Sequence, residues 1–273
     1  MKRLFLLLCM IFLSVNMVTL ALTLGKAPCC RLQSITQTSS LDSSLKKLDF
    51  SYDLSNRLTE EIVTSVNSEY PNSSYYNYTL KINYEYSEDK LTMLLKGREY
   101  STYTLENGII HLKELEYEKG RLTAVSYSHP IFMQPFHDEV DKVLFNWEGD
   151  DVIAISFNKG SQHVGSLRLE YRKEKCNSPL IYAHILHWLP SPYNFWHETW
   201  VNHAALFHCG LLTPTRLIDS CLWSTGESHV FSYTFDNYGN PLSMCCDFPK
   251  NDYEYFTITE RFTWKEFSLP LPE

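Results

Sequence analysis

The chain repeats one short pattern of apolar and polar positions. Apolar residues alternate with polar ones, an aromatic residue and an acid follow, a turn residue comes next, and an apolar residue restarts the alternation. The clearest copies cover residues 48–59 and 115–123. The apolar residues that follow the turns are 28 to 33 residues apart, with one interval of 62, or twice 31. They are Leu58, Leu91, Leu122, Val152, Leu180 and Leu242. This spacing predicts a fold built from repeated units.

Each copy has the pattern of a β-hairpin. Alternation with period two places the apolar residues on one face of a strand. Asn56 and Gly120 suit the turns because Asn and Gly tolerate positive φ, and acids such as Asp53, Glu118 and Asp236 can accept hydrogen bonds from nearby backbone N–H groups. We therefore predict an all-β fold with one inserted helix, in which about six hairpins form an antiparallel meander. The meander would curve into a curved sheet or incomplete barrel.

The N-terminal residues have the pattern of an export signal. Lys2 and Arg3 precede a mostly apolar stretch over residues 4–24, as in a secretory signal peptide. We expect residues 1–25 to be a cleaved signal peptide or an uncleaved membrane anchor, since the stretch is close to the length of a membrane span. Lipid attachment at Cys29 or Cys30 is a third option.

The rest of the chain is expected to form one domain. We assign residues 26–44 to a linker, residues 45–267 to a single repeat-built β domain and residues 268–273 to a tail. The net charge of −8 and the scattered Lys and Arg residues argue against a nucleic-acid partner. In an exported protein Cys209 and Cys221 could form a disulfide, with buried free thiols as the alternative.

One segment interrupts the repeat and differs in composition. Residues 181–229 carry four tryptophans and six histidines. A helix is expected near residues 196–212, because apolar residues recur there at helical spacing and Gly210 and Pro214 would end it. Such a helix would cover the concave side of the sheet, or would leave a pocket there. The candidate ligand-binding residues are His187, Trp188, Trp196, His197 and Trp200.

The same segment carries no recognisable catalytic or metal-binding motif. His197-Glu198 begins like the zincin helix motif, but the next histidine is His203, six residues on. HExxH needs a spacing of four to bring both imidazoles to one helix face. We therefore predict no catalytic residue, no metal site and no cofactor.

Several phrases resemble those of known repeat proteins. Residues 50–58 and 117–122 resemble YD-type repeats, as in Rhs-like and teneurin-like shells. Over residues 45–264 the chain is similar to uncharacterised secreted proteins of Gram-negative envelopes, described as a domain of unknown function with porin-like fold. Those proteins have a leader, about six hairpins, and a helix-bearing segment before a last copy, which here is residues 233–242. This chain differs from them in three ways. It lacks a clean lipobox, it contains cysteines, and its repeat copy near residues 176–180 matches the pattern poorly.

The resemblance implies a fold and a compartment, the periplasm or cell surface of a Gram-negative bacterium, and carries no established activity. We therefore expect a non-enzymatic envelope protein that binds partners or acts as a scaffold. Its concave face would hold an apolar or glycan ligand, and its partner would be a lipid, a glycan or an envelope protein. One alternative is a purely structural or protein-interaction module with a filled core. A second is a hydrolase or metal-dependent enzyme that uses the His- and Trp-rich segment.

Overall fold

The computed structural model describes residues 29–41, 44–74, 76–111, 115–126, 140–176, 178–181, 185, 215–249 and 255–267. The chain divides into two compact units, residues 1–31 with 265–273, and residues 32–264. The expected signal segment over residues 1–25 lies outside the described residues. The second unit contains almost all of the described strand residues. In the described part of the chain, no helix has the length and apolar character needed to cross a membrane.

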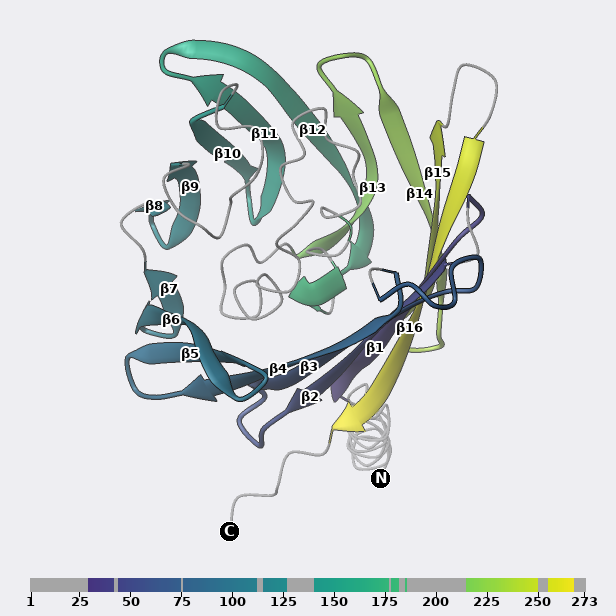
Figure 1. The fold of residues 1–273 in the computed structure, drawn as a ribbon. Helices are drawn as coiled ribbons and strands as arrows, with labels where there is room; N and C mark the ends of the chain where they lie inside the picture. The colour runs from purple at the N-terminus through teal and green to yellow at the C-terminus, as the bar shows by residue number, and fades with distance from the viewer. Residues whose placement is uncertain are drawn as a thin grey trace, which may run out of the picture. The chain divides into compact units, whose positions relative to one another are not determined.

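The described strands form one antiparallel sheet of sixteen strands. In sheet order they run from β7 through β6 to β1, then from β16 down to β8, so that each strand lies beside its neighbours in sequence except at two places (Figure 1). β1 lies beside β16, while β7 and β8 are the two edges. The strands are β1 (Cys29–Ser39), β2 (Ser44–Tyr52), β3 (Leu58–Asn67), β4 (Tyr78–Tyr86), β5 (Lys90–Leu95), β6 (Arg98–Glu106), β7 (Ile109–His111), β8 (Leu115–Glu118), β9 (Arg121–Ser126), β10 (Lys142–Glu148), β11 (Asp151–Lys159), β12 (Gln162–Lys175), β13 (Arg216–Trp223), β14 (Ser228–Phe235), β15 (Pro241–Pro249) and β16 (Tyr255–Phe267).

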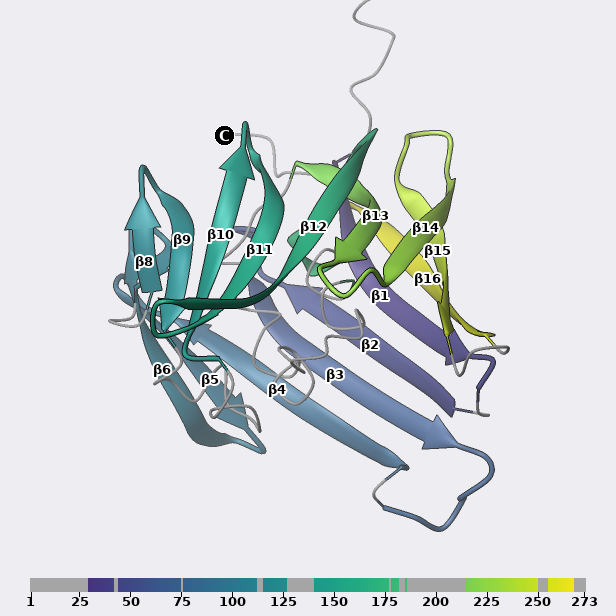
Figure 2. The same cartoon turned by 90° about the horizontal axis from the view of Figure 1, so that it is seen from above.

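The predicted architecture is confirmed: the sheet of residues 32–264 is an antiparallel meander that curves into an incomplete barrel (Figures 1 and 2). Five of the six predicted repeat copies are hairpins, namely β2–β3, β4–β5, β8–β9, β10–β11 and β14–β15. The acid before the turn acts as expected in two of them. Asp53 Oδ1 accepts a hydrogen bond from Arg57 N at 2.8 Å, and Asp236 Oδ1 accepts one from Tyr238 N at 2.8 Å. The turn residue Asn56 has a φ of 65°.

The sixth predicted copy, ending at Leu180, is wrong. β12 pairs with β13, far along the sequence, and residues 179–181 are helical. Pro179 cannot donate to a strand ladder, and its fixed φ suits the first turn of a helix. Ser178 Oγ accepts a hydrogen bond from Leu180 N at 3.3 Å, as an N-cap residue does. The helix expected near residues 196–212 lies outside the described residues.

The N-terminal boundary of the sheet also differs from the expectation. Residues 29–39, inside the segment assigned to a linker, form β1, and Ile35 pairs with Leu48 of β2. Ile35 is fully buried, but the polar Ser34 and Gln37 of the same strand are buried as well. These buried polar residues hide the alternation that would have marked β1 in the sequence.

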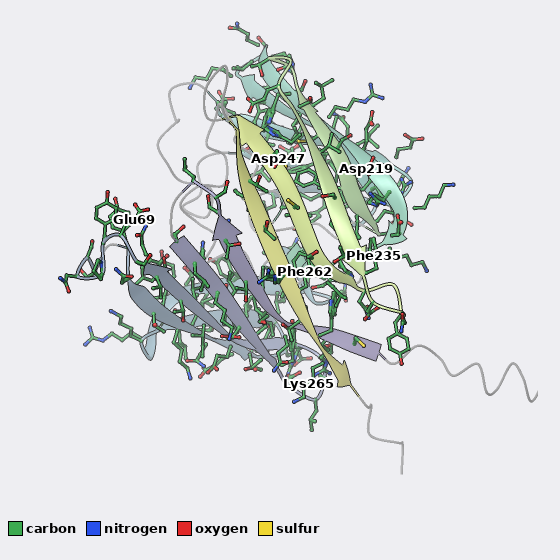
Figure 3. All side chains as sticks on the ribbon, turned by 90° about the vertical axis from the view of Figure 1, so that its right-hand side faces the viewer. Glu69, Asp219, Phe235, Asp247, Phe262 and Lys265 are labelled. Carbon is green, nitrogen blue, oxygen red and sulfur yellow. The ribbon has the colours of Figure 1, made fainter. Side chains whose placement is uncertain are left out.

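The sheet buries one face and exposes the other. Leu48, Val63, Ile82 and Leu91 face the core with at most 1% of their surface exposed, and each such side chain contributes about 1.5–3 kcal/mol by leaving water. The opposite face carries exposed ion pairs, among them Lys47–Asp49 at 2.8 Å and Lys142–Glu116 at 2.6 Å. Figure 3 labels two residues with opposite surroundings, exposed Asp247 on β15 and buried Phe262 on β16.

Aromatic side chains join six of the even-numbered strands to the strand before them. In each case a Tyr hydroxyl or Trp indole N–H donates a hydrogen bond to a backbone carbonyl, at 2.6 to 2.8 Å. We name these contacts aromatic staples. They are Tyr52 to Leu32, Tyr117 to Ile110, Trp147 to Leu122, Tyr171 to Val152, Tyr233 to Ile218 and Trp264 to Pro241.

The staples extend strand contacts where the backbone ladder is short. β9 and β10 share only three paired positions, as do β13 and β14, and Trp147 and Tyr233 bond beyond the ends of these ladders. Tyr117 donates across the two sheet edges, from β8 to Ile110 O of β7, and its ring stacks on His111 at 5.2 Å. Side chains thus connect strands at places where backbone pairing ends.

We predict that Tyr233→Phe lowers the free energy of unfolding by about 1–2 kcal/mol, because Ile218 O loses its hydroxyl donor while the ring is retained. Tyr238→Phe is the matched control, since Tyr238 lies on the turn of the same hairpin and is 57% exposed. Equilibrium denaturation with urea measures both variants. Equal effects of the two substitutions would show that the staple does not stabilise the sheet.

Candidate functional site

The five ligand-binding candidates, His187, Trp188, Trp196, His197 and Trp200, all lie outside the described residues. The structure therefore neither brings them together nor separates them. Their neighbours Leu180, Ile181 and Ile185 are described, and all three are buried in the same core as the inward residues of the sheet. The start of the inserted segment is thus part of the hydrophobic core.

A buried carboxyl group lies on the apolar face of the sheet. Glu61 of β3 pairs with Phe50 of β2 and Ile82 of β4, both buried apolar residues. Glu61 itself has no exposed surface. Tyr84 Oη donates a hydrogen bond to Glu61 Oε2 at 2.9 Å, while Glu61 Oε1 has no hydrogen-bond partner within the described part of the chain. A fully buried acid in an apolar wall is an unusual polar feature, because charged residue types are seldom fully buried.

The electrostatics of this carboxyl group involve two more charged residues. Burial raises the pKa of Glu61 from 4.5 to about 8, against the opposing effects of the Tyr84 hydrogen bond and of Lys46. Burial lowers the pKa of Lys46, while Glu61 and the buried Glu260 act in the opposite direction. We name Lys46, Glu61, Tyr84 and Glu260 the inner polar cluster. At neutral pH the raised pKa keeps Glu61 largely protonated.

The inner polar cluster is suited to binding a polar group. A protonated carboxyl donates one hydrogen bond and accepts others, and a lysine ammonium group donates up to three. The surrounding apolar residues would favour a ligand whose remaining surface is apolar. The Tyr84 hydroxyl donates to Glu61, but a carboxyl that is largely protonated at neutral pH is a poor base, so this pair does not have the arrangement of an activated nucleophile.

The sequence analysis missed this cluster. The sequence does contain one indication of it: Glu61 and Val63 are two positions apart, so they share one face of β3, and an acid there lies on the same face as an apolar inward residue. Ile62 and Val63 are both apolar, so the sequence leaves the inward phase of this strand ambiguous. Only the pairing with β2 and β4 identifies Glu61, rather than Glu60, as the inward acid.

A second group of inward polar residues lies on β13 to β15. Cys221, His229 and Cys246 are buried, and Cys221 pairs with His229 across the strands. Burial raises the pKa of the Cys221 thiol to about 12 and lowers the pKa of His229, an effect that Glu227 opposes. Burial likewise raises the pKa of Cys246. A protonated thiol is a poor nucleophile, so these residues do not form an activated Cys–His pair.

Cys221, Cys245 and Cys246 are free thiols. Cys209 lies outside the described residues, so the disulfide considered between Cys209 and Cys221 stays a prediction. Among the residues that the structure describes, no three His, Cys, Asp or Glu side chains are grouped so as to hold a metal ion.

Comparisons with known proteins identify similar structures but no family. No family model matches the chain, and no curated protein matches it. A porin-like protein from Bacteroides uniformis ATCC 8492 is 15% identical with a TM-score of 0.47, covering 86% of this chain and 98% of its own. A porin-like protein from Bacteroides vulgatus ATCC 8482 is 10% identical with a TM-score of 0.37, covering 86% and 99%. The resemblance to YD-type repeats stays a prediction.

We predict that Glu61 makes the protein less stable as the pH rises from 5 to 8. A carboxyl whose pKa is higher in the folded chain binds more protons there than in the unfolded chain, so its contribution to stability is largest below pH 4.5 and falls as the pH approaches 8. The loss over this pH range is of order 3–4 kcal/mol, since one pKa unit corresponds to about 1.4 kcal/mol.

Glu61→Gln should remove this part of the pH dependence, as measured by urea denaturation at several pH values. Glu60→Gln is the matched control, because Glu60 is the neighbouring acid and pairs with Lys81. It should keep the wild-type slope. If the slope were unchanged in Glu61→Gln, the folded-state pKa of Glu61 would not be raised.

Proposed function

We propose that this chain is a non-enzymatic binding protein of the bacterial cell envelope. Its concave face would hold an amphipathic ligand, a lipid or an apolar glycoconjugate, with the polar end of the ligand at the inner polar cluster. The observation that supports this proposal is the buried Glu61 Oε1, which has no hydrogen-bond partner among the residues that the structure describes. An envelope location is supported by the export-signal pattern over residues 1–25.

The energetics of Glu61 favour a ligand. Nearly all buried polar atoms in folded proteins have a hydrogen-bond partner, and leaving one without costs about 1–3 kcal/mol. A ligand hydroxyl, amide or carboxyl group beside Oε1 would remove that cost. Phe50, Val63 and Ile82 surround the position with apolar surface, which would take the apolar part of the same ligand.

The charges on the outer face indicate that this face contacts water. Its ion pairs, such as Lys47–Asp49 and Lys142–Glu116, are exposed on the side that would otherwise contact lipid. Charged side chains on the lipid face of a membrane-spanning sheet are destabilising. We therefore place the domain in the periplasm or at the cell surface, outside the hydrocarbon layer.

A second candidate is a structural or interaction module with a filled core. The observation that favours it is the burial of the inward residues without any ligand, since Leu48, Val63 and Leu91 are at most 1% exposed. In this case the inward side chains already have their packing partners, and only the outer surface would bind. The protonated thiols give no support to the hydrolase alternative.

The two candidate functions predict different results for the purified native protein: a binding protein should retain a bound ligand, and a filled-core module should not. The full chain would be produced in a Gram-negative host, extracted from the envelope under non-denaturing conditions and studied by native mass spectrometry. We expect the wild type to carry a non-covalent lipid or glycoconjugate. Glu61→Leu should reduce its occupancy at least tenfold, since losing about 1.4 kcal/mol of contact weakens binding tenfold.

Glu60→Gln is the control and should retain the adduct, because it changes the adjacent acid on the outer face. Absence of any adduct from the wild type, in a protein that melts cooperatively, would contradict ligand binding and favour the filled-core module. Equal occupancy in Glu61→Leu and the wild type would show that the ligand does not contact Glu61.

A further inference from the structure

Exposed apolar side chains gather at one end of β1 to β4. Twelve large hydrophobic residues are exposed in the described part of the chain, and half of them lie at the end of these strands that is away from the β2–β3 turn. They are Leu41, Leu45, Val66, Tyr70, Tyr76 and Tyr78. Single exposed apolar residues are common, but a local concentration of them indicates a binding surface.

The loop between β3 and β4 holds the centre of this region in a defined conformation. Asn77 Nδ2 donates to Tyr70 O at 2.6 Å and to Ser73 O at 3.1 Å, while Asn77 Oδ1 accepts from Asn67 N at 2.7 Å. Asn67 is itself buried, and its side chain accepts a hydrogen bond from Glu69 N at 2.9 Å. Two asparagine side chains therefore replace the missing ladder bonds and fix the backbone of the loop.

Two of the three tyrosines of this loop, Tyr70 and Tyr76, form an exposed aromatic pair. The rings of Tyr70 and Tyr76 stack with their centroids 5.0 Å apart and an interplanar angle of 27°. They remain 53% and 42% exposed. Ser65 Oγ donates to Tyr76 O at 2.9 Å and ties the pair to the end of β3. A rigid loop that presents aromatic rings loses little entropy on binding a ligand.

We propose that Tyr70 and Tyr76 form a binding site for a neutral glycan, on the outside of the protein and independent of the concave face. A sugar ring places its C–H groups against an aromatic face, where they meet the negative side of the ring quadrupole. Its hydroxyl groups stay near polar side chains, here the tyrosine hydroxyls and the exposed Glu69, which Figure 3 shows on the projecting loop.

The charge of the protein argues for a neutral ligand. The chain has a net charge of −8, and the loop over residues 68–77 contains Glu69 and no Lys or Arg. An anionic polysaccharide or an anionic lipid surface would be repelled there. A neutral sugar has no such penalty, and its hydroxyl groups can donate to the Glu69 carboxylate.

The test is electrophoresis of the full chain through native gels that contain dextran, xylan, laminarin or galactomannan. We expect at least one of these neutral polysaccharides to retard the wild type. Isothermal titration calorimetry with oligosaccharides of that polymer would give the affinity. Y70A and Y76A should each weaken binding at least tenfold, whereas Y70F and Y76F, which keep the rings, should retain most of it.

Tyr238→Ala is the matched control, because Tyr238 is exposed to a similar degree on a turn at the opposite end of the sheet. It should bind as the wild type does, and all variants should melt within a few degrees of the wild type. Failure of all four polysaccharides to retard the wild type would overturn the proposal. The proposal would also be overturned if Y70A and Y76A bound glycans like the wild type but lost self-association or binding to neutral lipid vesicles.

Discussion

The aromatic staples are the contacts on which the continuity of this sheet depends. A backbone ladder joins two strands only over the residues that stay in register. Tyr233 and Trp147 bond to carbonyls beyond the ends of two ladders that have only three paired positions each, and Tyr117 bonds across the two edges. Because the staple needs both a large apolar ring and a donor, only Tyr and Trp can supply it. This requirement accounts for the aromatic residue directly before the acid in three of the repeat copies, namely Tyr52, Tyr117 and Trp147.

The same reasoning shows which parts of the fold could be predicted from the sequence. Hairpins such as β2–β3 were predictable, because alternation, acid and turn residue lie within one short segment. The partner of β12 was not, since β13 follows only after the inserted segment, and Pro179-Leu180 imitates the residues after a turn. β1 was missed because it buries Ser34 and Gln37 beside Ile35. Local patterns predicted the repeated units, and the long-range pairings came only from the structure.

The inner polar cluster was harder to predict for a related reason. Two adjacent acids, Glu60 and Glu61, occur at the start of β3, and only the register with β2 and β4 decides which one faces the core. One forms a surface ion pair with Lys81, while the other loses its hydration and has its pKa raised to about 8. Two glutamates one position apart therefore lie in opposite environments, one on the exposed face and one in the core. A sequence without a known register cannot separate them.

The distribution of polarity across the sheet limits how the protein can act. The inward face is mostly apolar, whereas the outer face carries exposed ion pairs and, at one end of β1 to β4, exposed apolar residues. Water-soluble partners meet the outer face and the loops. The meander places the turns of β2–β3 and β14–β15 at one end and the β3–β4 loop at the other. The first residues of β1 lie at the turn end, since Tyr52 beside the β2–β3 turn bonds to Leu32 O. The chain therefore enters the sheet at the end opposite Tyr70 and Tyr76, which leaves that aromatic pair on the far side of the domain, away from the N-terminal entry point.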